Sequence, residues 1–157
     1  MKKALALLAF LMMYLQLTAQ NAKPKVYDET INPMEQIDKA IARAKAENKN
    51  VICQVGGNWC RWCLMFADFI KSDSIVNQAI NDNYVYIHVN FARKDAGGEL
   101  DKRLACASRF GFPALVVLDA EGKVRHIQDS SFLEEGEGYN EKKVLRFLNN
   151  WTPQATK

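Results

Sequence analysis

Two cysteines three residues apart stand between a strand-like and a helix-like stretch of the sequence. Cys60 and Cys63 lie in NWCRWC, after the apolar run VICQV and before a run with helical spacing that extends to about Lys71. Side chains three apart on a helix have Cβ atoms about 5–6 Å apart, close enough for the sulfurs to form a disulfide or to stand as two thiols. The pattern predicts a cysteine pair that can be oxidised and reduced.

A helix start would favour the ionised form of the first cysteine. Unpaired backbone N–H groups and the positive end of the helix dipole stabilise a negative charge there, more for Cys60 than for Cys63. Arg61 adds a positive charge nearby. Cysteines in such surroundings have pKa values lowered into a range of roughly 3.5–7.5. We therefore expect Cys60 to attack a partner's disulfide, and Cys63 to attack Cys60 and release the partner.

Three other uses of the pair fit the sequence less well. A zinc site needs more ligands, yet Cys53, Cys106, His88 and His126 show no second ligand spacing. Covalent haem attachment needs a histidine where Leu64 stands. A purely structural disulfide across so short a loop would constrain the unfolded chain little. Redox chemistry with no metal and no organic cofactor is the favoured interpretation.

The remaining aromatic and thiol side chains have two interpretations each. Trp59 and Trp62 could supply apolar surface around the sulfurs or could simply pack in the interior, and the sequence favours neither. Cys53 in a buried strand and Cys106 in a helix beside alanines are best interpreted as inert core thiols. The alternative is a second, regulatory disulfide or a resolving thiol at Cys106.

The elements that must position the cysteine pair follow from the hydrophobic spacing. Asn32 as a cap, followed by Pro33, begins a helix that runs to about Glu47. Further along, the sequence predicts a strand at 51–55, a helix at 60–71, a helix or turn at 72–81, a strand at 84–90, a loop at 91–99, a helix at 100–110, a hairpin of strands at 114–119 and 123–127, a surface loop at 128–139 and a helix at 140–151. Because a helix separates the first two strands and a tight turn joins the last two, we expect an α/β fold with a mixed central sheet of about four strands, flanked by helices on both faces.

The first residues have the layout of an export signal. A basic start at Lys2 and Lys3, an apolar run and the small residue Ala19 are typical of a cleaved secretory signal peptide. The apolar run is shorter than the roughly 20 residues of a membrane-spanning helix. The chain of 157 residues has room for one domain. The sequence thus predicts a signal peptide at 1–19, an exposed leader at 20–32, one domain at 33–151 and a C-terminal tail at 152–157, in a periplasmic or secreted protein.

The balance of charge gives no reason to expect nucleic-acid binding. The net charge is only +3 at pH 7, and loss of a signal peptide would remove two of the lysines.

With NWCRWC after VICQV, and GFPALVVLDAEGKV further along, the sequence resembles the thioredoxin superfamily over about residues 33–151. It is most similar there to exported thioredoxin-like proteins, including the thioredoxin-like domain of the thiol:disulfide interchange protein. The resemblance implies the thioredoxin fold, with Cys60 and Cys63 as the catalytic pair. It also implies a cis peptide bond between Phe112 and Pro113, which would lie against the disulfide.

Two positions depart from the typical pattern of the superfamily. Many thioredoxins carry a buried acid six residues before the first cysteine, where this chain has Gln54. Because glutamine does not titrate, proton transfer to or from Cys63 would need water or another group. Arg61 and Trp62 stand between the cysteines in place of the typical Gly-Pro. Behaviour like that of a cytosolic thioredoxin is therefore not expected.

The resemblance implies an exported thiol:disulfide oxidoreductase that acts on protein thiols and disulfides and exchanges electrons with a membrane or soluble redox partner. The reductase direction is favoured by resemblance alone. An extended substrate strand would contact Trp59, Trp62, Phe112 and Pro113. The alternative is a peptide-binding adaptor or chaperone with the same fold and a permanently closed disulfide. The sequence does not indicate an oligomeric state.

Overall fold

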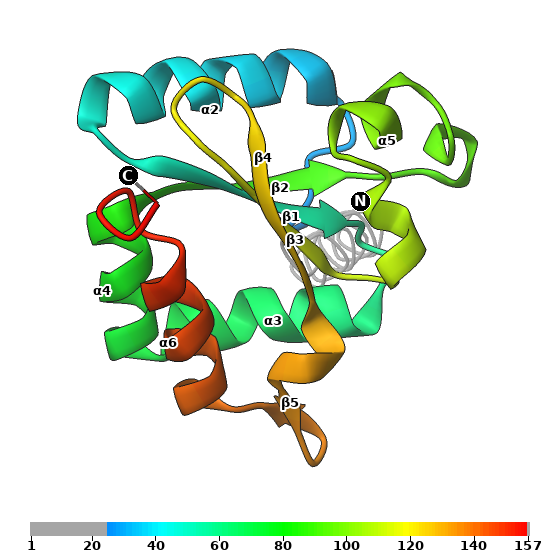
Figure 1. Ribbon diagram of the computed structural model, residues 1–157. Coiled ribbons are helices and arrows are strands. Elements are labelled where there is room, and N and C mark those ends of the chain that lie inside the picture. The colour runs from blue at the N-terminus through cyan, green and yellow to red at the C-terminus, as the bar shows by residue number, and fades with distance from the viewer. Residues whose placement is uncertain (1–24, 157) are drawn as a thin grey trace, which may run out of the picture.

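The computed structural model describes residues 25–156. Its centre is a four-stranded sheet in the order β2-β1-β3-β4 (Figure 1). The strands are β1 (Asn50–Gly56), β2 (Tyr84–Asn90), β3 (Ala114–Leu118) and β4 (Val124–Asp129). β1 pairs in parallel with β2 and antiparallel with β3, and β3 and β4 form the predicted hairpin. The expected mixed sheet is confirmed.

Helices cover both faces of the sheet (Figure 1). They are α2 (Pro33–Glu47), α3 (Arg61–Ser72), α4 (Ser74–Asn83), α5 (Glu99–Arg103) and α6 (Glu141–Asn150). α2 lies over one face, and α3, α4 and α6 lie over the other. The α/β architecture with helices on both faces is therefore confirmed.

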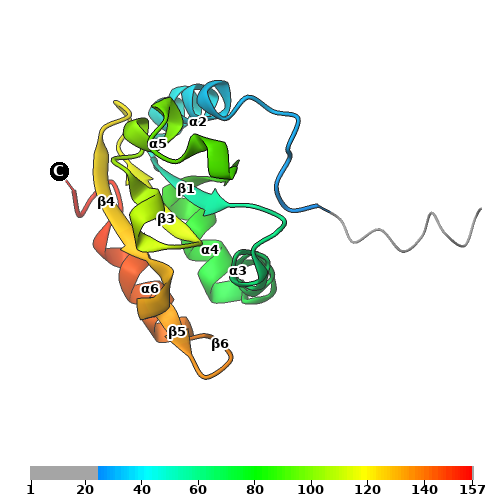
Figure 2. The ribbon, with the colours of Figure 1, turned by 90° about the vertical axis from the view of Figure 1, so that its right-hand side faces the viewer.

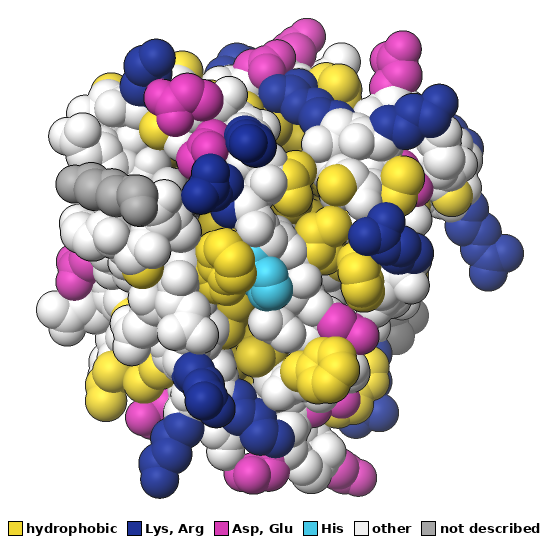
Figure 3. Space-filling model, in the orientation of Figure 1, with side chains coloured by type: hydrophobic (Ala, Val, Ile, Leu, Met, Phe, Trp, Pro, Cys, Tyr) yellow, Lys and Arg dark blue, Asp and Glu magenta, His cyan; other side chains and the backbone are white. Residues whose placement is uncertain are grey.

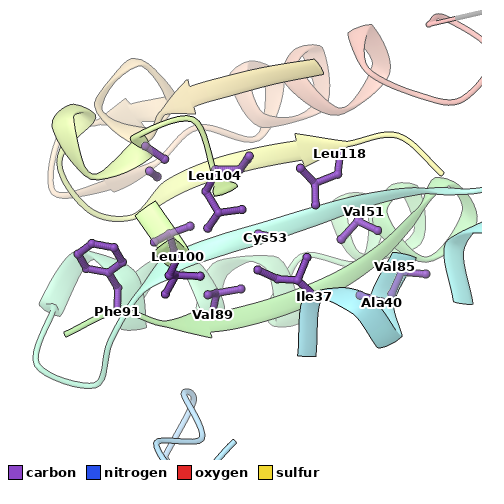
Figure 4. Packing of buried hydrophobic residues seen from close by; sticks show 14 of the residues in the cluster. Ile37, Ala40, Val51, Cys53, Val85, Val89, Phe91, Leu100, Leu104 and Leu118 are labelled. Atoms are coloured by element: carbon purple, nitrogen blue, oxygen red, sulfur yellow. The ribbon is translucent and has the colours of Figure 1, made fainter. Parts of the chain in front are cut away.

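The side chains of β1 alternate between two hydrophobic cores, as the two-residue period of a strand requires. Val51, Cys53 and Val55 pack with α2 in the first core, which Figure 4 shows from close by. Ile52 packs in the second core with apolar residues of α3, α4 and α6. Because β1 is buried on both faces, it is apolar except at Asn50 and Gln54. The end of this strand is thereby held rigidly where the cysteine pair begins.

The helix starts follow the capping residues seen in the sequence. The Asn32 side chain accepts a hydrogen bond from the Met34 N–H at 2.9 Å, as expected for α2. Asp73 and Asn140 cap α4 and α6 in the same way. α3 begins one residue later than predicted, at Arg61, with Cys60 as its N-cap.

The predicted helix at 100–110 is wrong in its second half. α5 ends at Arg103, Ala105 and Cys106 adopt left-handed backbone angles, and a 3₁₀ helix follows at Ala107–Phe110. The cause is the buried carboxylate of Asp101, which accepts hydrogen bonds from the Gly97 N–H at 3.0 Å and from the Ser108 hydroxyl at 2.9 Å. These bonds close a loop that a continuous helix could not form. Cys106 is therefore half-buried in a turn and is not a core thiol in a helix.

The predicted surface loop at 128–139 contains more structure than expected. It holds the end of β4, a 3₁₀ helix at Ser130–Leu133 and a short hairpin of β5 (Glu134–Glu135) and β6 (Gly138–Tyr139). Leu133 is buried, and Tyr139 packs edge-on against Phe66 of α3 with ring centroids 4.7 Å apart. Because most residues of this segment are polar or acidic, its sequence did not indicate that Leu133 and Tyr139 pack in the interior.

The segment before α2 runs beside the connection between β1 and α3 (Figure 2). Its residues from 28 to 32 are exposed, as expected, but Tyr27 is fully buried. The predicted signal peptide, its cleavage point after Ala19 and the first part of the leader lie outside the described residues. So does Lys157 at the end of the tail.

On the face of the molecule shown in Figure 3, basic and acidic side chains are interspersed and surround smaller hydrophobic patches. Within residues 25–156, no helix has both the length and the apolar character needed to cross a membrane.

Candidate active site

Cys60 and Cys63 form a disulfide where β1 gives way to α3, with their Cα atoms 5.2 Å apart. The turn after β1 places the Cys60 N–H against the Gly57 carbonyl at 3.0 Å. Cys60 has extended backbone angles and caps α3 with its sulfur, which accepts a hydrogen bond from the Cys63 N–H at 3.2 Å. The helix start thus directs a backbone donor at the sulfur that would carry negative charge after reduction.

The two sulfurs differ in their access to solvent. Cys60 retains 8% of its surface, whereas Cys63 is completely buried. Of the two residues, only Cys60 thus has any exposed surface. Gly56 makes room for the buried sulfur, since a Cβ on this residue would lie only 2.5 Å from Cys63 Sγ. The end of β1 can approach the disulfide this closely only because residue 56 has no side chain.

The first turn of α3 contains no acidic residue, and Arg61 on it is exposed. Arg61 forms no ion pair with the residues from 25 to 156. The structure thus places Arg61 as a solvated positive charge on the turn that carries Cys60, where water and salt would screen it. Its effect on the Cys60 thiolate stays a prediction.

The two tryptophans around the cysteines have different environments. Trp59 is 60% exposed, donates its indole N–H to the Phe91 carbonyl at 3.2 Å and meets Phe112 edge-on with ring centroids 5.2 Å apart. Trp62 is half-buried and packs edge-on against Tyr139 at 5.7 Å. Trp59 therefore presents apolar surface beside Cys60, while Trp62 also packs on the cluster formed by Tyr27, Cys60 and Cys63. Contact of either tryptophan with a substrate stays a prediction.

The loop before β3 lies against the disulfide. The peptide bond between Phe112 and Pro113 is cis, as the resemblance implied. Pro113 is buried, and Phe112 packs on the cluster formed by Tyr27, Cys60 and Cys63. The structure thus brings Phe112 together with the cysteine pair and Trp59.

Gln54 is buried beneath the cysteine pair, at the position where many thioredoxins carry an acid. Its Nε2 donates to the Cys63 carbonyl at 2.9 Å and to the Tyr27 hydroxyl at 2.6 Å. Its Oε1 accepts from the Tyr86 hydroxyl at 2.6 Å. Both N–H donors and the carbonyl oxygen of this buried amide have a partner, so Gln54 is fixed in one orientation.

Asn58 ties the segment before α2 to the turn that carries the cysteines. Its Oδ1 accepts from the N–H groups of Val26 and Tyr27 at 3.1 Å each. Its Nδ2 donates to the Tyr27 carbonyl at 2.8 Å and to Glu29 at 2.9 Å. These bonds hold the Tyr27 side chain in the interior beside Cys63.

Sequence reasoning missed Tyr27, Asn58 and Tyr86 as residues of the site. The one available signal was the apolar pair Val26-Tyr27 within an otherwise polar leader. The partners of Tyr27 lie about 30 residues away in the sequence, as the separations of its contacts show, and no local spacing indicates such a contact.

Burial keeps two titratable groups near the site, Cys53 and His88, in their neutral forms at neutral pH. Burial raises the pKa of the Cys53 thiol to about 12, as expected for an inert core cysteine. Burial lowers the pKa of His88 to about 4, and its Nε2 is buried without a hydrogen-bond partner among the described residues. Cys53 and Cys106 are both free thiols in this structure. Within residues 25–156 no cluster of three or more His, Cys, Asp or Glu side chains could hold a metal ion.

The chain is similar in sequence to a curated protein. Disulfide bond reductase DsbH of Chlamydia pneumoniae is 28% identical over 95 residues, which cover 57% of this chain and 57% of that protein. The match therefore spans little more than half the length of this curated relative.

Solved structures show the same fold. The crystal structure of disulphide isomerase from Xylella fastidiosa Temecula1 superposes with a TM-score of 0.71 at 23% identity, over 82% of this chain and 98% of that one. A structure described as DsbH Oxidoreductase gives a TM-score of 0.51 at 24% identity, over 71% of this chain and 78% of that one. The thioredoxin fold is shared.

One family model covers nearly the whole domain. The model Thioredox_DsbH, described as "Protein of unknown function, DUF255", matches residues 17–152. The chain therefore belongs to the Thioredox_DsbH family, within the thioredoxin superfamily.

Proposed function

We propose that this chain is an exported thiol:disulfide oxidoreductase that reduces disulfides in protein substrates. One observation carries the proposal: a disulfide at the start of α3 in which Cys60 reaches the surface and Cys63 is completely buried. This asymmetry supports attack by the first sulfur and resolution by the second.

The reaction begins with the reduced pair. The Cys60 thiolate attacks one sulfur of the partner's disulfide, a mixed disulfide forms, and the partner's other sulfur leaves as a thiolate that takes a proton from water. Cys63 then loses its proton and attacks Cys60 Sγ. The mixed disulfide breaks, the partner leaves with its second thiol, and Cys60 and Cys63 are joined. Two electrons have passed to the partner, and a membrane or soluble redox partner must return them.

The reductase direction is supported by the printed name of the Chlamydia pneumoniae relative, a disulfide bond reductase. Export is supported by the basic start, apolar run and small residue of the first 19 residues.

Trapping of substrates tests the chemistry. In Cys63→Ser, the mixed disulfide made by Cys60 cannot be resolved, so it should accumulate as adducts that a reducing agent dissolves. The matched control is Cys60→Ser/Cys63→Ser, which retains Cys53 and Cys106 and should give no adducts. Two results together would reject the proposal: adducts equally abundant in the control, and no reduction of insulin by the native chain. They would favour a binding module with a permanently closed disulfide.

Equilibration with glutathione buffers tests the direction. A reductase should have a reduction potential nearer that of thioredoxin, about −270 mV, than that of an oxidase such as DsbA, about −120 mV. A reduction potential near that of DsbA would still support an oxidoreductase, but it would indicate an oxidase and not a reductase.

Expression of the full chain in a bacterial host tests export. The mature protein should be recovered outside the cytosol with Gln20 as its first residue. A cytosolic protein that retains Met1 would contradict export without affecting the redox chemistry.

A further inference from the structure

Three side chains joined by hydrogen bonds form a series that runs from β2 toward the buried sulfur of Cys63. The Tyr86 hydroxyl lies 2.6 Å from Gln54 Oε1, and Gln54 Nε2 lies 2.6 Å from the Tyr27 hydroxyl. A Cβ built on Gly56 would lie 2.9 Å from that hydroxyl and 2.5 Å from Cys63 Sγ, so hydroxyl and sulfur flank the same point. The three residues come from β1, β2 and the segment before α2.

The backbone carbonyl of Cys63 fixes which groups donate and which accept along this series of hydrogen bonds. The Cys63 carbonyl oxygen lies 2.9 Å from the Gln54 amide and can only accept a hydrogen bond. The NH₂ end of Gln54 must therefore face Cys63, and with it Tyr27. The Tyr27 hydroxyl accepts from this NH₂ group, so its own proton remains to be donated. Within residues 25–156 that proton has no other hydrogen-bond acceptor.

We propose that Tyr27 donates a hydrogen bond to the Cys63 thiolate when the disulfide opens, and so stabilises that thiolate in a site where Gln54 stands in place of an acid. In the oxidised protein Cys63 Sγ is held by Cys60. Once this bond breaks, the sulfur and the hydroxyl can turn toward one another. The Cys63 proton leaves to water, and Tyr27 keeps its own proton while stabilising the negative sulfur.

Two physical effects favour this role. Burial raises the pKa of Tyr27, so the phenol remains a proton donor throughout the range in which a thiol ionises. Donation from Gln54 to the Tyr27 oxygen, itself supported by Tyr86, polarises the Tyr27 O–H and strengthens its hydrogen bond. A hydrogen bond to a charged sulfur is worth more than one to a neutral sulfur, so the pKa of Cys63 should fall.

The other titratable groups around these three side chains are Cys60, Cys53, His88 and Tyr139. The His88 ring meets Tyr27 and Tyr86 edge-on, each at 5.4 Å. Because burial lowers the pKa of His88 to about 4, it is neutral while Cys63 titrates. The charged residues Lys25, Asp68 and Lys71 line the same surface cavity as His88, of about 420 Å³.

The inference rests on the proposed function, but its test does not need a substrate. The pKa of Cys63 is measured in the fully reduced protein from the pH dependence of its ¹³Cβ chemical shift. Tyr27→Phe keeps the ring and removes the donor, so the pKa of Cys63 should rise by about one pH unit. The matched control is Tyr84→Phe, which removes another buried hydroxyl that donates to the Leu148 carbonyl.

An unchanged Cys63 pKa in Tyr27→Phe, or an equal rise in Tyr84→Phe, would overturn the inference. A second readout is the rate at which Cys63 releases a small thiol from a mixed disulfide on Cys60. At neutral pH this rate should fall about threefold in Tyr27→Phe, because the smaller thiolate fraction is partly offset by a more nucleophilic thiolate, and it should recover at alkaline pH. If the native chain reduces no protein disulfide, the proposed function fails, while the titration still decides the role of Tyr27.

Discussion

The backbone carbonyl of Cys63 accepts a hydrogen bond from the side chain of Gln54 at 2.9 Å. The bond joins the buried end of the cysteine pair to the centre of β1, nine residues earlier in the chain. Because the amide presents a donor to Cys63 and an acceptor to Tyr86, a side chain with two acceptor oxygens could not satisfy both contacts. The site is therefore built for an uncharged residue.

Gln54→Glu should make the stability of the domain fall as pH rises. A carboxylate at this position would face the Cys63 carbonyl, so the glutamate should be held protonated, with a pKa above its unfolded value of about 4.3. A group whose folded pKa is raised contributes its stability below the unfolded pKa, and this stability is lost as pH rises through the folded pKa. Relative to the native chain, we expect a loss of about 1–3 kcal/mol between pH 4 and pH 8.

Urea unfolding at several pH values measures this loss. The native chain, whose amide does not titrate, supplies the reference curve. A stability difference that stays constant from pH 4 to pH 8 would show that the carboxylate has found a donor.

Gly56→Ala should destabilise the oxidised protein by about 1–3 kcal/mol. Its Cβ would lie 2.5 Å from Cys63 Sγ and 2.9 Å from the Tyr27 hydroxyl, so both side chains would have to move. Gly138→Ala is the matched control, since a Cβ there meets nothing within 4 Å, and it should change stability by no more than about 0.5 kcal/mol. Urea unfolding of both variants decides the matter, and equal effects would contradict the close approach of β1 to the disulfide.

The sequence was sufficient to predict the elements and residues that depend on local spacing. Asn32 caps α2 as expected, the mixed sheet has the expected strands, and Cys60 stands at the start of α3. Hydrophobic period and capping chemistry are local properties, so they can be read from neighbouring residues. The cis bond before Pro113 followed from the resemblance and not from the residues themselves.

The parts that the sequence could not predict depend on distant contacts. Asp101 ends α5 early because it binds Gly97 and Ser108 around a closed loop. Tyr27 enters the site because Asn58 holds the backbone of its segment. In both cases a polar side chain forms hydrogen bonds with backbone groups across a turn, and the pattern of apolar residues does not predict such bonds.

His88 should make the domain less stable in mild acid. Burial lowers its folded pKa to about 4, whereas an unfolded histidine titrates near 6.5. Because its folded pKa is depressed, the stability is fully present above about pH 6.5 and is lost as pH falls toward 4. The loss should be about 2 kcal/mol, since the half-buried ring can be partly solvated.

Urea unfolding at pH 7 and pH 4.5 measures this effect. His88→Gln should reduce the difference between the two values, and His126→Gln, which removes the other histidine of the chain, should preserve it. A difference that persists unchanged in His88→Gln would assign the acid sensitivity to carboxylates.

Trp59→Ala should impair the reduction of protein disulfides more than that of small ones. The indole is 60% exposed, yet it is held by the Phe91 carbonyl and by the edge of Phe112, so it forms a rigid apolar surface beside Cys60. A large aromatic side chain that is ordered before binding contributes strongly to the capture of a partner. We expect kcat/KM for insulin to fall about tenfold, while the rate with oxidised glutathione changes less than about twofold, because its few atoms bury little of the indole.

Phe132→Ala is the control, since this side chain is 73% exposed in the 3₁₀ helix after β4, and both rates should remain native. An equal loss for insulin and glutathione in Trp59→Ala would instead place the effect on the reactivity of Cys60.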